Sequence, residues 1–463
     1  MKTLTTVVLS LFALTGAAHG QESAVPPASD PRLFDIVDAV RADRIESDIR
    51  TLVGFGTRHT LSDTLSQTRG IGAARRWIKA EFDRISAECG GCLEVVYQRD
   101  LVKGGEGSRI PEDTWVVNVL AIQRGSTHPN HYVIMSGDID SRVSDVLDAT
   151  SESPGANDNA SGVAGVLEAA RVLSKHRFGK TIVYAALSGE EQGLYGGRIM
   201  AEAARDEGWI IEGVLNNDMI GNIEGVDGVI DNRTFRIFSE PTPVTESEQE
   251  RQRRRFTGGE VDGPSRQLAR YVARLADQYM PSVEPMLVYR LDRYGRGGHH
   301  RPFNDLGFPG VRIMEAHENY TRQHQDLRTE TVMVKAAGGG ETPVEIAYGD
   351  VIEGVNFDYA AKLTAVNAIT LASLAWAPPA PDSVRIRGAV RPAAKLSWKR
   401  VDSPEVAGYK VYWRLTTEPQ WTHSRWVGDV EEFTAEGLII DNYLFGVAAV
   451  GRDGNESVVV FPR

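Results

Sequence analysis

Short runs rich in β-branched residues alternate with helical stretches through the middle of the chain. The runs "TWVVNVLAIQ", "HYVIMSGD", "TIVYAALSGEE" and "EGVLNNDMIG" are typical of strands, and "SGVAGVLEAARVLSKH" and "LYGGRIMAEAARDEG" are typical of helices. Strands that alternate with helices form crossover units and a largely parallel sheet. The sequence therefore predicts an α/β domain over residues 32–377, with a mostly parallel central sheet flanked by helices.

The last eighty residues show a different pattern. "AKLSWKRVD", "GYKVYWRLT" and "NYLFGVAAVGRDGNES" alternate apolar and polar residues with turns between them, which is typical of a β-sandwich. We expect a proline-rich linker at 378–383 and an all-β domain at 384–463. This part resembles a fibronectin type III module, with Trp398 in the core and Tyr443 near the tyrosine corner. A polymer or a protein is a conceivable ligand of this module, but nothing in its sequence names one.

The N-terminus has the pattern of a targeting segment. Lys2 precedes an apolar run, and Ala18 and Gly20 place small residues where a signal peptidase cleaves. We expect residues 1–20 to be a signal peptide, the protein to be exported to the periplasm or the extracellular space, and residues 21–31 to be a disordered leader. An uncleaved anchor is the alternative.

Two cysteines, Cys89 and Cys92, occur in "CGGC". In an oxidising compartment a pair this close forms a local disulfide. The alternative, a redox motif, needs the pair at a strand-to-helix turn, whereas this pair follows a helical stretch. We expect a structural disulfide.

The net charge limits the classes of partner. A charge of -12 over 463 residues disfavours nucleic acid, whose phosphates would be repelled, and a polybasic membrane anchor. The expectation is therefore no nucleic acid and no stable membrane insertion. An acidic surface is compatible with a cationic ligand such as a free amino terminus, although solubility explains it equally well.

Acidic and imidazole residues follow several of the expected strands. They are Asp138, Asp158, Glu190 with Glu191, and Asp218, with His324 much later. An aspartate after a strand is usually a helix cap or turn residue, and Asp158 alone could cap the helix that begins near Ala160. In open α/β sheets, however, sites form at the carboxyl ends of the strands, where such side chains converge. Together these residues predict a site.

"LSGEEQGLYGG" is the most informative segment because it carries two adjacent carboxylates at the end of a strand. One of them can bind a metal while its neighbour acts as a base. Hydrolysis assisted by a metal needs both a cation that activates water and a carboxylate that takes the proton. The segment therefore predicts a metal-dependent hydrolase.

"PGANDNASGVAGVLEAARVL" followed by "ALSGEEQGLYGG" is highly specific. With these motifs, residues from about 51 to 376 resemble the co-catalytic zinc aminopeptidases of peptidase family M28, in clan MH. The resemblance implies that Asp158 bridges two zinc ions, that Glu190 is the general base, and that Glu191 and Asp218 each bind one ion. It also implies a histidine ligand late in the domain, for which we prefer His324 to the nearby competitor His317.

Two departures from the family pattern concern this site. Where the family has a histidine ligand two residues before an aspartate, "GDID" has Asp138 and then Asp140, which leaves the orienting role of Asp140 open. Where the family has Asp-His, "GGHHRPF" has His299 and His300, which we treat as additional ligand candidates. The two changes could be complementary.

The expected function is an exported metallo-aminopeptidase that acts on peptides with two divalent ions. We expect Asp138 to bind metal and its oxygen-rich position to prefer a harder ion such as manganese, unless His299 faces inward and restores zinc. The first alternative is a one-zinc acyl-transfer enzyme resembling the glutaminyl cyclases, which keep a set equivalent to Asp158, Glu191 and His324. The second is a catalytically inactive binding module on a peptidase scaffold. Two, one or no tightly held ions per chain would separate these readings.

Overall fold

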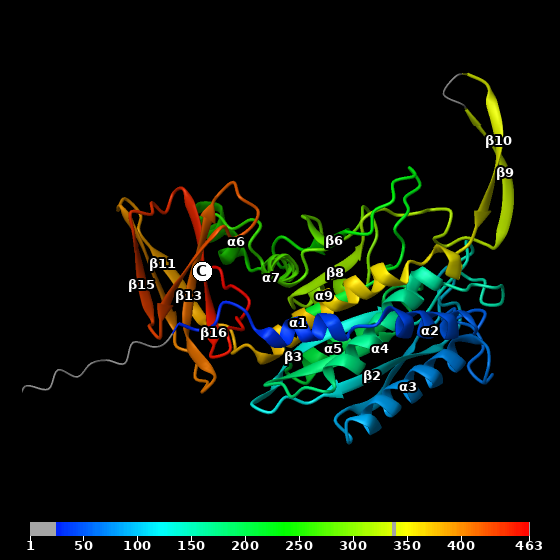
Figure 1. Ribbon diagram of the computed structural model, residues 1–463, viewed down its shortest axis with the longest axis horizontal. Helices are drawn as coiled ribbons and strands as arrows, with labels where there is room; N and C mark the ends of the chain where they lie inside the picture. Colours follow the sequence, from blue (N-terminus) through cyan, green and yellow to red (C-terminus); the bar gives the residue numbers. More distant parts are fainter. Residues whose placement is uncertain (1–24, 336–338, 463) are drawn as a thin grey trace, which may run out of the picture.

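The protein is described here by a computed structural model that covers residues 25–335 and 339–462 (Figure 1). The expected signal peptide, residues 1–20, lies outside the described residues, and so does the first part of the expected leader. No helix within the described ranges is long and apolar enough to cross a membrane.

In the described chain, the larger domain is built on an eight-stranded sheet with the order β1-β2-β4-β3-β5-β8-β6-β7. Its strands are β1 (Glu94–Val102), β2 (Thr114–Gln123), β3 (His128–Asp138), β4 (Lys180–Leu187), β5 (Ile210–Asn217), β6 (Thr234–Ser239), β7 (Glu284–Val288) and β8 (Gly310–Glu315). β4, β3, β5 and β8 are neighbours and run parallel, whereas β1, β2 and β6 form the antiparallel pairs. The predicted mostly parallel α/β sheet is confirmed.

Helices cover both faces of this sheet (Figure 1). They are α1 (Pro31–Ala39), α2 (Ala42–Val53), α3 (Gly70–Glu88), α4 (Gly162–Leu173), α5 (Tyr195–Asp206), α7 (Pro264–Tyr279), α8 (His300–Asp305) and α9 (Phe357–Trp376). A further helix, α6 (Glu248–Thr257), has no buried residue and lies beside the C-terminal domain (Figure 1). Every residue of β4 is buried, because alternate side chains point to opposite faces and both are covered. Ile182 and Tyr184 pack with α4 and α9 in the larger core, and Val183 and Ala185 pack with α5 in the smaller one.

Between β8 and α9 the chain forms a hairpin that projects from the domain (Figure 1). Its strands are β9 (Arg328–Lys335) and β10 (Glu341–Tyr348), which pair antiparallel. Most of its described side chains are exposed. It begins four residues after His324, so the loop that carries this histidine is anchored on one side by β8 and leads on the other into an exposed ribbon.

The C-terminal domain consists of two three-stranded antiparallel sheets packed face to face. One contains β11 (Asp382–Arg387), β12 (Ala393–Lys399) and β15 (Glu432–Glu436), and the other β14 (His423–Gly428), β13 (Val406–Leu415) and β16 (Tyr443–Gly451). Trp398 and Tyr409 are buried between them, 5.3 Å apart by ring centroid. Small antiparallel sheets at the C-terminus agree with the predicted all-β part.

Buried polar groups join the two domains. Asp262, just before α7, accepts two hydrogen bonds from Arg414 of β13 at 2.8 and 2.9 Å. Asp30 accepts from Asn455 at 2.7 Å, and its own N–H donates to Tyr279. Asp30 therefore differs from the disordered leader expected for residues 21–31, because it is buried and caps α1.

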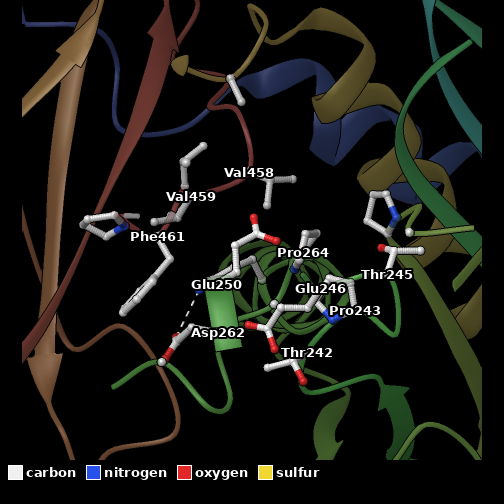
Figure 2. A pocket seen from close by; sticks show the side chains of 18 of the residues that line it. Thr242, Pro243, Thr245, Glu246, Glu250, Asp262, Pro264, Val458, Val459 and Phe461 are labelled. Carbon is white, nitrogen blue, oxygen red and sulfur yellow. Dashed lines mark hydrogen bonds between the residues drawn. The ribbon is translucent and has the colours of Figure 1, made fainter. Parts of the chain in front are cut away.

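A cavity of about 540 Å³ lies where the two domains meet (Figure 2). Val459 and Phe461 of the C-terminal segment line one side, and Pro243 and Thr245 of the larger domain line the other. Its described lining residues include none of the predicted metal ligands.

At the end of α3, Cys89 and Cys92 form a disulfide, as the sequence predicts.

Candidate metal centre

The predicted site residues lie at the carboxyl ends of neighbouring parallel strands. Asp138 ends β3 and pairs in register with Leu187, the last residue of β4. Glu190 and Glu191 follow β4, and Asp218 follows β5, whose register places Asn217 beside Gly137. Because these strand ends lie at one edge of the sheet, side chains distant in sequence converge there. The remaining acidic residue, Asp158, lies in the short helical turn Ala156–Ser161, which leads into α4.

Asp158, Glu191 and His324 converge on one point. Nε2 of His324 lies 2.9 Å from Oδ2 of Asp158 and 2.8 Å from Oε1 of Glu191. Within the described residues these three form the one group of His, Cys, Asp and Glu side chains that could hold a metal ion, with ligand atoms within 4.8 Å of one another. Two carboxylate oxygens and one imidazole nitrogen fit zinc and leave a fourth position open. His317 lies 3.7 Å from Asp231 and outside this group.

Charges within the group shift its pKa values strongly. Burial alone would lower the pKa of His324, but the Glu191 and Asp158 carboxylates raise it to about 9. The same pairing outweighs burial and lowers the pKa of both carboxyls. Glu190 behaves oppositely, because burial and the neighbouring Glu191 raise its pKa well above the ordinary value. The pKa values of the two adjacent carboxyls are thus shifted in opposite directions. This fits a metal ligand, Glu191, beside a proton-accepting base, Glu190.

Asp140 and Asp350 hold the loops that carry these ligands. Asp140 is buried and accepts the backbone N–H groups of Glu190 and Glu191 at 3.2 and 3.0 Å. Asp350, which the sequence analysis did not single out, accepts the backbone N–H of Asp158 at 2.6 Å. Asp140 thus finds backbone amides in place of the imidazole that the family pattern would supply.

Arg142 contacts two of the three candidate ligands. Its Nε donates to Oε2 of Glu191 at 2.8 Å, and its Nη2 lies 2.7 Å from Nδ1 of His324. A metal-bound imidazole usually donates its second N–H to a carboxylate or a carbonyl, and here a guanidinium stands in that place. Arg142 belongs to "SGDIDSR", but no family motif pointed to it.

Asp138 lies outside the three-residue group, which differs from the expectation that it binds metal. Its Oδ2 accepts from Nδ2 of Asn159 at 2.8 Å, and its Oδ1 lies 2.5 Å from Nδ1 of His299. Both carboxylate oxygens are therefore engaged. His299 and Asp138, the two departures from the family pattern, meet in space and form a buried pair. His300 instead directs Nε2 to the carbonyl oxygen of Leu291 at 2.9 Å, so it holds the fold of this loop.

Asp218 is paired with a buried arginine. Nη2 of Arg312 lies 2.8 Å from Oδ2 of Asp218, and Nη1 lies 3.2 Å from Asp292. Arg312 is fully buried in the middle of β8. Sequence reasoning missed it, although a charged residue within the apolar run "GVRIME" was a usable signal, since a fully buried arginine needs a partner.

The backbone around the site takes unusual conformations. Five non-glycine residues of the described chain have positive φ, and three of them adjoin the site: Leu194 at 62°, Met219 at 62° and His324 at 53°. Bulky side chains rarely adopt this region, and such residues persist where surrounding structure enforces them, often at functional sites. The conformation of His324 itself is thus part of how its ring reaches the two carboxylates.

Comparison with known proteins places the chain in a family. The model of peptidase family M28 matches residues 118–332. A probable zinc metalloprotease from Pyrenophora tritici-repentis is 42% identical over 441 residues, which cover 95% of this chain and 88% of that protein. One from Leptosphaeria maculans is 43% identical over 95% of this chain and 98% of its own length. The chain belongs to peptidase family M28.

Solved structures show the same fold. The LapA aminopeptidase of Legionella pneumophila superposes with a TM-score of 0.52 at 17% identity, covering 77% of this chain and 78% of that one. LapB from the same organism gives 0.51 at 15% identity, over 76% and 77%. At these identities the likeness concerns the fold alone.

Proposed function

We propose that the protein is a zinc-dependent exopeptidase, an aminopeptidase that hydrolyses N-terminal peptide bonds. The observation that carries this proposal is the convergence of Asp158, Glu191 and His324 beside Glu190. These four residues line a cavity of about 250 Å³. A space of that size admits one or two residues of a peptide, which favours a terminal bond over one inside a long chain. The printed names of the relatives, probable zinc metalloproteases, support the same chemistry.

The residues take the following roles in this proposal. Asp158, Glu191 and His324 would hold zinc, which when bound supplies a Lewis acid that polarises the scissile carbonyl and makes water more acidic. Glu190 would take the proton from the attacking water and deliver it to the leaving amine. Asp140 would keep Glu190 in place through its backbone N–H.

We further propose one tightly held ion per chain, in place of the two expected from the family pattern. A second ion would need Asp138 and Asp218, whose carboxylates are engaged by His299 and Arg312. A one-ion site also favours the second candidate function, acyl transfer like that of the glutaminyl cyclases. Retention of Glu190 beside the three ligands supports catalysis over an inactive binding module.

Matched carboxylate variants test the assignment of the adjacent pair. Glu190→Gln should lower turnover by roughly 10²–10⁴-fold with zinc content unchanged, because it removes the base and keeps the ligands. Glu191→Gln should lose zinc, and Glu202→Gln on the exposed face of α5 is the control for both. Exchanged phenotypes would reverse the assignment, and full activity in both variants would refute it.

A substrate panel distinguishes the two candidate functions. Aminoacyl anilides release their leaving group under the peptidase proposal. Peptides with an N-terminal glutamine release ammonia without cleavage of any peptide bond under the acyl-transfer alternative. Zinc content by plasma mass spectrometry on the same samples gives the number of ions.

Two more proposals concern the ends of the chain. Residues 1–20 would direct export, and cleavage would follow Gly20. The C-terminal sandwich would be a fibronectin type III-like module that binds a polymer or a protein. The arrangement of its two sheets and the buried Trp398 support that likeness.

A further inference from the structure

Five arginines line the cavity that contains the candidate metal centre: Arg109, Arg142, Arg293, Arg296 and Arg301. The chain as a whole carries a net charge of -12, so this concentration of positive charge is local. A cavity that holds only a metal ion and the amino terminus of a peptide, neither of them an anion, has no need of it.

Arg301 is the least neutralised of the five. No carboxylate of the described residues forms an ion pair with it within 4.0 Å, and its Nε is buried without a hydrogen-bond partner. Gly297 makes room for its side chain, since a Cβ added there would lie 2.8 Å from Cδ and 2.9 Å from Nη1 of Arg301. A buried guanidinium nitrogen without an acceptor is costly unless a ligand supplies one.

The other arginines leave positive charge unmatched as well. Arg109 is exposed and donates to the backbone oxygen of Glu191 at 2.7 Å, which neutralises no charge. Arg293 and Arg296 contact Glu318 at 3.1 and 3.9 Å, but this carboxylate is already paired with Arg236 at 2.8 Å. Arg293 also lies 3.5 Å from Asp292, which it shares with Arg312.

Arg142 pairs with Glu191, a carboxylate that would also bind the zinc ion. The carboxylates that line the cavity are Asp158, Glu190, Glu191 and Asp218. A bound zinc ion would neutralise Asp158 and Glu191, and Arg312 already pairs with Asp218. The loaded cavity therefore carries excess positive charge.

We propose that the cavity recognises a carboxylate on the substrate residue that it admits, with Arg301 as the anchoring residue and Arg109 at the rim. This inference rests on the proposed peptidase function and names its substrate class. The carboxylate has two possible sources, the acidic side chain of an N-terminal residue or the free α-carboxylate of a C-terminal residue. An arginine can bind either one through two parallel hydrogen bonds.

Isosteric substrate pairs test the charge of the substrate at constant size. The zinc-loaded protein is assayed with glutamyl and glutaminyl anilides, and with an N-blocked dipeptide that ends in a free carboxylate or in an amide. The expected result is a kcat/KM at least tenfold higher for the carboxylate member of one pair, and the pair that responds identifies the source. A response of the N-blocked pair would also replace the proposed aminopeptidase by a carboxypeptidase, because an aminopeptidase needs a free amino terminus. Cleavage of both members at equal rates would overturn the inference while leaving the peptidase function standing. Absence of cleavage of every substrate by zinc-loaded protein would instead refute the proposed function.

Variants of Arg301 test the anchor. Arg301→Met should lower kcat/KM for the carboxylate substrate by about 10–100-fold, the range for loss of a charged hydrogen bond, and leave the isosteric neutral substrate within about twofold. Arg301→Lys should retain part of the preference, because it keeps the charge and loses the paired geometry. Arg205→Met on α5, an exposed arginine paired with Asp206, is the control. Equal losses on both substrates in Arg301→Met, with zinc content unchanged, would show a merely structural role and overturn the assignment.

Discussion

Replacement of Arg312 by methionine is the sharpest test of the number of metal ions. The Arg312 guanidinium pairs with Asp218 at 2.8 Å and with Asp292 at 3.2 Å, and it is fully buried. A dication bound to Asp218 at ~4 Å from this guanidinium would be repelled by roughly 8 kcal/mol at an effective dielectric constant of about 20. His299, the partner of Asp138, is no such obstacle, because burial lowers its pKa to about 4 and leaves it uncharged at neutral pH. Wild-type protein in zinc excess should therefore hold one ion per chain, and Arg312→Met should accept a second.

The loss of the arginine also has a cost in stability. Removing one partner of a buried ion pair costs about 3–5 kcal/mol, because the remaining charge stays buried without compensation. We expect a cost near the lower limit of this range, because the buried carboxyl of Asp218 can take up a proton instead of keeping its charge. Burial raises the pKa of Asp218 to about 7, close to neutral pH. Arg293, 3.5 Å from Asp292, stays in place. A loss of ~3 kcal/mol lowers Tm by about 4 °C for a domain of roughly 350 residues.

The assay combines zinc content by plasma mass spectrometry after gel filtration with Tm measured with and without zinc excess. Arg171→Met is the matched control, because Arg171 is also buried and paired, with Asp48 and Glu81, but lies away from the site. The control should lose a similar amount of stability and keep one ion. Zinc should raise the Tm of Arg312→Met more than that of Arg171→Met. Two ions in the wild-type protein, or one ion in both variants, would refute the reasoning.

Three further expectations concern pH, Asp138 and the mature chain. The apo protein holds a proton on His324 up to a pKa of about 9, above the ordinary value of 6.5, and zinc must displace it. The apparent zinc affinity should therefore rise about tenfold per pH unit from 6.5 towards 9 and level off above it, which calorimetry in two buffers with different ionisation enthalpies measures together with the released proton. Asp138→Ala should keep one zinc and lower Tm, because its histidine partner is left unpaired; loss of zinc in this variant would restore Asp138 as a ligand. Intact mass of exported protein should begin at Gln21, with no alkylatable thiol before reduction of Cys89 and Cys92.

The fold could be predicted because its signals are local. Each strand of the parallel core is a short β-branched run, and its covering helices show a helical apolar period, so alternation alone specified the architecture. Residues 25–31 were harder, since a segment rich in proline and alanine has the composition of a disordered leader. Asp30 is ordered by partners about 250 and 425 residues away, Tyr279 and Asn455, which no local pattern can reveal.

The candidate site was predictable only in part. Asp158, Glu190 and Glu191 stand in motifs whose spacing is fixed by one strand and one turn, so their convergence with His324 follows from the fold. The pairing of Asp138 with His299 depends on the approach of two loops 161 residues apart. The sequence supported only the hypothesis that the two changes compensate each other.

Arg312 shows why charge was the hardest property to predict. Its neighbours in sequence are apolar, and the carboxylates that explain it, Asp218 and Asp292, come from other loops. A carboxylate-rich segment predicts a cation nearby, but it does not say whether the cation is a metal or a side chain. A guanidinium and a divalent ion satisfy the same oxygen atoms.

The choice between these two cations has a consequence for substrates. A metal ion is acquired from solution and leaves when it is chelated, whereas Arg312 and Arg301 are permanent charges of the chain. Arg312 neutralises Asp218 on the inner wall without a metal, so the carboxylates there cannot attract a substrate's amino group as strongly as unpaired ones would. Arg301, with no carboxylate of its own in the described chain, is left to attract an anion. If the protein holds one ion as we propose, the same exchange of a metal for an arginine would also shift the charge of the favoured substrate towards negative.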